Sequence, residues 1–120
     1  MRNTIAALLI LGVITTTSAQ VIVNKVDINT QTTTMEVWAV KKPFSDKESF
    51  FLDFGQDKFR PHYYDHKTQM ISDKEGSKFE KGQWMQLLNY LQSQGWEMQS
   101  ERPTTIGEQE GRIITFMRKQ

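Results

Sequence analysis

The stretch GQWMQLLNYLQSQGWEMQS, residues 82–100, carries the strongest structural signal in the sequence. Apolar side chains recur in it at the i, i+3, i+4 and i+7 spacing that places them on one side of a helix. They are Trp84, Leu87, Leu88 and Leu91. Gly95 can adopt the left-handed conformation that ends a helix, and Trp96 can then fold back onto the last turn. We therefore expect a helix over 82–94 and a strand over 96–100.

On both sides of this helix the sequence has the pattern of strands. We expect further strands over 21–28, 35–41, 49–54, 67–72 and 112–119, with a loop over 103–110. The strand over 35–41 has apolar residues on both faces, which indicates burial on both sides. Short connections between strands favour antiparallel pairing. The sequence thus predicts an α+β domain, an antiparallel sheet with one helix packed on one face.

The first nineteen residues differ from all that follow. Arg2 is the only charge before Lys25, residues 5–14 are apolar apart from one glycine, and 15–19 are small. This is the layout of a secretory signal peptide, and Ala19 suits the position before the cut. The apolar run is about half the roughly 20 residues that a membrane-spanning helix needs. We expect an exported protein, periplasmic or secreted, without stable membrane insertion after cleavage. The alternatives are an uncleaved anchor and a buried first strand.

Removal of residues 1–19 from the 120 leaves one domain of 101 residues, 20–120, in which 20–34 is a candidate loose strand and linker. Without Arg2, 14 Lys and Arg residues balance 14 Asp and Glu residues. Nucleic-acid binding draws on a strong positive field, so a nucleic-acid partner is not expected. The chain has no cysteine, which excludes disulfides and thiol chemistry.

Residues 62–66, His-Tyr-Tyr-Asp-His, form the densest cluster of side chains with binding chemistry. His62, Asp65 and His66 supply the donor types that zinc and copper sites use. On a strand the two histidines would share a face but lie about 13 Å apart at roughly 3.3 Å per residue, too far for one ion unless the chain bends. Pro61 argues against a helix there. A small metal-binding protein or metal-dependent enzyme therefore remains the alternative function.

The same segment offers aromatic and basic side chains for recognition. Arg60, Tyr63 and Tyr64 lie in a predicted loop, and loops held by a rigid sheet often carry binding residues. Tyrosine and arginine are enriched in protein interfaces. We therefore expect these three residues to contact a partner, either an envelope protein or a glycan.

Three short segments suggest a family. EVWAVKKPF at 36–44, DFGQ at 53–56, and LNYL at 88–91 followed by GWE at 95–97 resemble a group of small exported bacterial proteins of unknown function. The helix, the Gly-Trp-Glu element and the closing strand are also similar to the domain-of-unknown-function family 4177. The resemblance covers most of 34–119. It implies the fold class and the export, and it adds no catalytic residue.

The sequence offers little for catalysis. It contains no Gly-x-Ser-x-Gly nucleophile motif and no glycine-rich phosphate loop. Acid pairs such as Glu108 and Glu110 fall in predicted turns, where solvated carboxylates are ordinary. The function expected is therefore a non-catalytic binding or assembly module of the bacterial cell envelope, without a cofactor.

Overall fold

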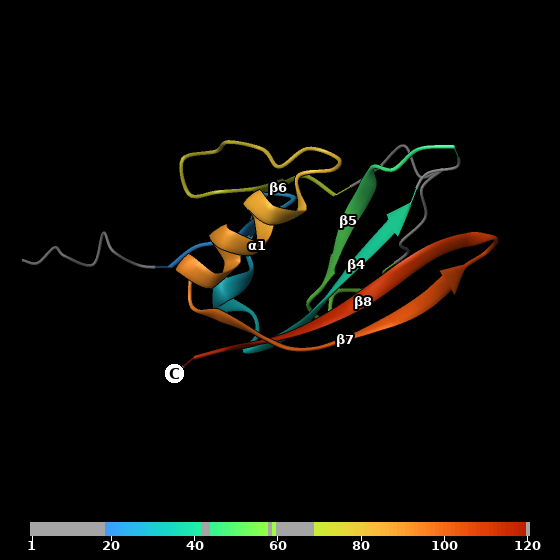
Figure 1. Ribbon diagram of the computed structural model, residues 1–120. Helices are drawn as coiled ribbons and strands as arrows, with labels where there is room; N and C mark the ends of the chain where they lie inside the picture. Colours follow the sequence, from blue (N-terminus) through green and yellow to red (C-terminus); the bar gives the residue numbers. More distant parts are fainter. Residues whose placement is uncertain (1–18, 42–43, 58, 60–68, 120) are drawn as a thin grey trace, which may run out of the picture.

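The computed structural model describes residues 19–41, 44–57, 59 and 69–119. These residues form two antiparallel sheets and one α-helix, the α+β class expected (Figure 1). In chain order the elements are β2 (Ile22–Val23), β3 (Val26–Asp27), the 3-10 helix η2 (Ile28–Thr30), β4 (Thr34–Lys41), β5 (Glu48–Asp53), β6 (Ile71–Ser72), α1 (Trp84–Ser93), β7 (Trp96–Ile106) and β8 (Gln109–Arg118).

The larger sheet has four strands in the order β5-β4-β8-β7. Central strand β4 pairs with both neighbours, so that Val37 lies opposite Leu52 of β5 and Ile114 of β8. Side chains alternate between the two faces of a strand. Apolar side chains of β4 are buried on both faces, for example Val37 on one and Val40 on the other. The predicted two-sided burial of this strand is confirmed.

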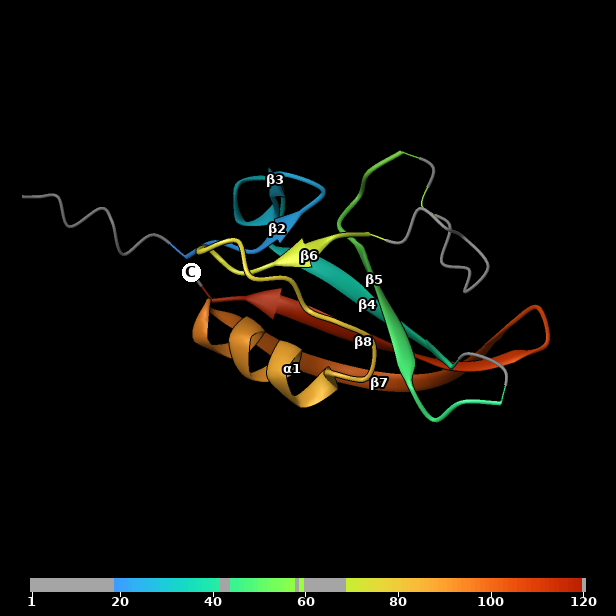
Figure 2. The ribbon, with the colours of Figure 1, turned by 90° about the horizontal axis from the view of Figure 1, so that it is seen from above.

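The smaller sheet, in the order β3-β2-β6, was not predicted as a separate unit, and its three strands lie together in Figure 2. One strand was expected over 21–28, but the chain turns back at Asn24 and Lys25. Both residues have positive φ, 50° and 71°, and two such residues make the tight hairpin turn that suits the twist of paired strands. The segment therefore forms two short strands. The predicted strand over 67–72 is observed only at β6 among its described residues.

The predicted loop over 103–110 is wrong, because β7 and β8 continue through it as a long hairpin (Figure 1). Proline has no N–H to donate to a partner strand, which disfavours it inside a sheet. However, Pro103 lies in β7, which is an edge strand of its sheet. An edge strand tolerates proline where the missing N–H would face away from the partner strand. Gly107, with φ of 63°, occupies the first position of the two-residue turn.

Helix α1 is shorter by a few residues than predicted. Gly82 has a φ of 79°, and its N–H donates to the carbonyl of Glu48, so it lies outside the helix. The predicted stop is confirmed: Gly95 has a φ of 94°, and Trp96 begins β7 directly after it. The helix therefore ends where the sequence indicated and begins at Trp84.

One continuous apolar core joins residues from both sheets and from α1. Leu87 and Leu91 are completely buried in it, and Trp84 and Leu88 pack against it while half-buried. The predicted clustering of Trp84, Leu88, Leu91 and Trp96 is thus confirmed. The buried members from the strands, the turns and η2 are Val21, Val23, Ile28, Met35, Val37, Ala39, Phe50, Leu52, Ile71, Trp96, Ile114 and Phe116.

Asn29, in the middle of η2, connects the N-terminal segment to this core. Its side-chain oxygen accepts a hydrogen bond of 2.8 Å from the indole N–H of Trp96, and both side chains are buried. Its amide nitrogen donates to the carbonyl of Gln94, 3.3 Å away, at the C-terminal end of α1. A buried indole N–H without a partner would cost about 1–3 kcal/mol. Asn29 therefore fixes three segments relative to one another.

We predict that Leu87→Ala lowers the free energy of unfolding by about 2–5 kcal/mol, because a fully buried leucine leaves a cavity. Met85 lies on the exposed side of the same helix and provides the control. Met85→Ala should change the value by less than about 0.5 kcal/mol. Urea unfolding measures both, and equal effects for the two variants would contradict the assigned helix face.

Candidate functional site

All six residues predicted to form a site lie outside the described residues. They are Arg60, His62, Tyr63, Tyr64, Asp65 and His66. The nearest described residue, Phe59, packs edge-on against Trp38 of β4, with ring centroids 5.6 Å apart. Trp38 in turn donates its indole N–H to Glu36, 3.1 Å away. The predicted binding segment thus follows an aromatic contact on the sheet.

A different site is formed at the end of the large sheet where β4 ends, β5 and β8 begin, and β7 approaches its turn. It is an open pocket of about 380 Å³, which we call the charged pocket. Its lining residues come from all four strands, and most of them are charged. They are Lys41, Glu48, Glu101, Arg102, Pro103, Glu110, Gly111 and Arg112.

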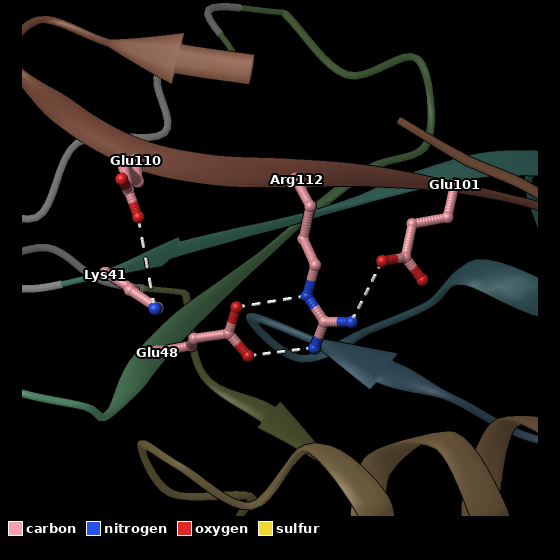
Figure 3. A network of polar contacts seen from close by, with 5 residues as sticks. All are labelled: Lys41, Glu48, Glu101, Glu110 and Arg112. Atoms are coloured by element: carbon pink, nitrogen blue, oxygen red, sulfur yellow. Dashed lines mark hydrogen bonds and ion pairs between the residues drawn. The ribbon is translucent and has the colours of Figure 1, made fainter. Parts of the chain in front are cut away.

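Arg112 is the centre of the charged pocket (Figure 3). Its Nε and Nη2 atoms donate to the two carboxylate oxygens of Glu48 at 3.0 and 2.9 Å, a bidentate pair. Nη1 donates to Glu101 of β7 at 3.3 Å. Bidentate pairing fixes the orientation of the guanidinium as well as its position. The side chain of Glu48 is only 16% exposed, so this pair is shielded from water more than an ordinary surface ion pair.

The first residue of α1 covers the guanidinium. The Arg112 Cζ atom lies 4.8 Å from the ring centroid of Trp84, within the range of a cation–π interaction. On the sheet side, Trp84 packs against Phe50 of β5, with centroids 5.7 Å apart. Arg112 is therefore held by two carboxylates and one aromatic face, which leaves it little freedom.

Burial and pairing act in opposite directions on the pKa of Arg112. Burial alone lowers the pKa, but the hydrogen bonds and charges of Glu48, and then of Glu101, outweigh it and raise the pKa above its ordinary value. The guanidinium therefore stays charged at all physiological pH values.

The rim of the charged pocket is more open. Lys41 and Glu110 lie on opposite strands with 4.0 Å between amine nitrogen and carboxylate oxygen, and the Glu110 side chain is 82% exposed. A pair so exposed contributes about 0–1 kcal/mol to stability. The Lys41–Glu110 ion pair can therefore be replaced by ion pairs with a ligand at little cost in stability.

Gly111 makes the wall of the pocket thin. A Cβ added there would lie 2.9 Å from the backbone oxygen of Ala39, closer than such atoms approach in proteins. The neighbouring strand therefore requires glycine at this position. The result is a stretch of bare backbone between Glu110 and Arg112.

Two further pockets among the described residues are lined by fewer charged side chains. One, of about 330 Å³, lies at the opposite end of β4 near Glu36, Asp53 and Gly55. The other, of about 120 Å³, lies beside β5, where the Gln69 side chain bonds both the N–H and the carbonyl of Leu52 and so satisfies part of the strand edge.

In the described ranges, no three His, Cys, Asp or Glu side chains lie close enough together to hold a metal ion. Within these ranges there is also no helix with the length and apolar character needed to cross a bilayer. Glu97, beside the buried Trp96, is exposed and pairs with Lys119 at 3.4 Å, as expected of a surface residue.

Comparison with known proteins adds no relative. No protein-family model matches the chain, and no curated protein or solved structure matches it significantly. The resemblance to family 4177 rests on the short motifs alone.

The charged pocket was not predicted, although the sequence contains a signal for it in the positions of two charged residues. Glu48 lies on the same face of its strand as Phe50 and Leu52, and Arg112 lies on the same face as Ile114. Both charges therefore point to the apolar face of their strands. A charge in such a position requires a partner. The pairing of these two charges depends on the strand order, which the sequence did not specify.

We predict that Glu48→Gln lowers the free energy of unfolding by about 1–3 kcal/mol, because Arg112 loses its charged partner in a shielded position. Glu110→Gln removes the same charge at the open rim and should cost less than about 0.5 kcal/mol. Thermal and urea unfolding at low salt compare the two variants. A similar effect of both would show that the pair with Glu48 is no stronger than a surface pair.

Proposed function

We propose that this protein is an exported, non-catalytic binding or assembly module of the bacterial cell envelope, and that the charged pocket is part of its contact surface. The observation that carries the proposal is the fixed arrangement of Arg112. A guanidinium held by Glu48, Glu101 and Trp84 is preorganised, and a preorganised site loses less entropy on binding.

The position of α1 supports this assignment. We infer that α1 packs on the face of the large sheet that carries Val37, Phe50 and Ile114, since these residues share the core with Leu87 and Leu91. Trp84 contacts both Phe50 and Arg112, so the cover would end at the edge of the charged pocket. The pocket would then be the part of that face that remains open to a partner.

An exposed aromatic residue lies between two pocket residues in the sequence. Phe44 lies in the connection between Lys41 and Glu48, two residues of the pocket lining, and its side chain is fully exposed. Its φ of 58° is unfavourable for a residue with a side chain, and such strain occurs often at binding sites. An exposed phenylalanine in the connection between two pocket residues suits a protein partner, because aromatic anchors supply most of the energy at many interfaces.

The chemistry of the pocket favours a partner with charges of both signs. Glu101 and Glu110 can accept from cationic groups, while Lys41 can pair with a carboxylate. A polypeptide segment with neighbouring acidic and basic side chains would meet these groups.

We predict that the double variant Phe44→Ser/Lys41→Glu loses its envelope partner, with binding weakened about tenfold or more. The measurement is quantitative capture from an extract of the native envelope by the purified, tagged protein. Met85→Ser/Lys81→Glu likewise replaces an exposed apolar side chain by serine and a lysine by glutamate, but at other positions, and should bind like the wild type. Both variants should keep the unfolding midpoint of the wild type.

Two results would contradict the proposal. Retention of every partner by the Phe44→Ser/Lys41→Glu variant would exclude the charged pocket as the contact surface. A tightly bound metal ion that is lost in His62→Ala would favour the alternative function, in which His62, Asp65 and His66 form a metal site.

A further inference from the structure

Gln20 follows the predicted cleavage position directly, and both of its backbone polar groups are bound by side chains. Its N–H donates to the Gln94 side-chain oxygen at 2.9 Å, and its carbonyl accepts a hydrogen bond from the Tyr90 hydroxyl. Both bonds are partly buried and span 74 and 70 positions of the chain. Gln94 and Tyr90 lie at the C-terminal end of α1.

The surroundings of the Gln20 backbone nitrogen favour a positive charge. Carbonyl groups at the C-terminal end of a helix carry partial negative charge. Burial raises the pKa of Tyr90, the hydrogen bond from the Lys74 backbone N–H acts in the opposite direction, and the charges of Asp73, Glu75 and Asp27 raise the pKa further. Asp27 belongs to β3, and Asp73 and Glu75 belong to the turn after β6.

Four cations belong to the same elements and their neighbours. Lys25 follows β2, and Lys74 donates its backbone N–H, rather than its amine, to the Tyr90 hydroxyl. Lys119 pairs with Glu97, and Arg118 approaches Gly95 through its aliphatic chain. The described structure gives none of these amines or the guanidinium a hydrogen bond to Gln20, Gln94 or the Tyr90 hydroxyl.

We propose that Gln94 and Tyr90 form a binding site for the protein's own amino terminus, which is created when the chain is cut after Ala19. Cleavage would convert the Gln20 amide N–H into an ammonium group, with one donor already directed at Gln94. The inference rests on the proposed export and is independent of the charged pocket. It assigns to the Gln94 side chain, the Tyr90 hydroxyl and the acidic turn a role that the packing of the apolar core does not explain.

The charge makes the effect dependent on pH. An ammonium group that gains an acceptor and a negative surrounding has a higher pKa in the folded than in the unfolded chain. Its contribution to stability is then complete below the unfolded value of about 7.7–8.0 and is lost as the pH rises through the folded value. Replacing Gln94 by alanine removes the acceptor and should therefore weaken this dependence on pH.

The test uses exported protein purified without an N-terminal tag. Intact mass should show a chain that begins at Gln20 with a free amine. Urea unfolding is then measured at about pH 6.5 and pH 9.5, on either side of the amine's ordinary pKa. Between these values the folding equilibrium constant of the wild type should fall about two- to fivefold more than that of Gln94→Ala.

Tyr90→Phe is the second variant, since its ring can still pack against Phe79 while the hydroxyl loses its bonds to the Gln20 carbonyl and to the Lys74 backbone N–H. It should reduce the same pH-dependent difference. A chain that retains residues 1–19, or whose Gln20 has cyclised with loss of its charge, would overturn the inference. So would a correctly cleaved chain with equal pH dependence in all three proteins, and that result would leave the export and the charged pocket intact.

Discussion

The buried hydrogen bond from the Trp96 indole to Asn29 is the constraint on which the other parts of the structure depend. Trp96 is the largest fully buried side chain, and it can be buried only if its N–H finds an acceptor. Asn29 supplies the acceptor and also bonds Gln94, so one side chain joins η2, the end of α1 and the start of β7. In a cysteine-free chain, this hydrogen bond links side chains that lie 67 positions apart in the sequence.

The two candidate sites lie at opposite ends of α1. At its first residue, Trp84 covers Arg112 and borders the charged pocket. At its last turn, Tyr90 and the adjoining Gln94 hold Gln20. Asn29 holds the C-terminal end of the helix, while Phe50 and Arg112 hold its first residue, Trp84. The same helix thus relates the amino terminus of the described domain to the proposed contact surface.

The sequence predicted those features that depend on neighbouring residues. The apolar stripe and Gly95 located α1 and its end, because both signals act within one or two turns. It failed where the outcome depends on distant partners. The predicted loop over 103–110 was wrong because a strand at the edge of a sheet can contain Pro103, and the edge position of β7 depends on its partner strands. Asn29 fell in the predicted linker because its partner Trp96 lies 67 positions away. The charged pocket was missed for the same reason, since four strands must assemble before Arg112 meets its partners.

A double-mutant cycle between Asn29 and Trp96 tests the central constraint most directly. Asn29→Ala, Trp96→Phe and the double variant would be compared with the wild type by urea unfolding. If the hydrogen bond ties the segments together, the double variant should lose about 1–2 kcal/mol less free energy of unfolding than the sum of the two single variants. The reason is that Trp96→Phe already removes the donor that Asn29 satisfies. Additivity within about 0.5 kcal/mol would contradict the account and show that the two residues stabilise the fold independently.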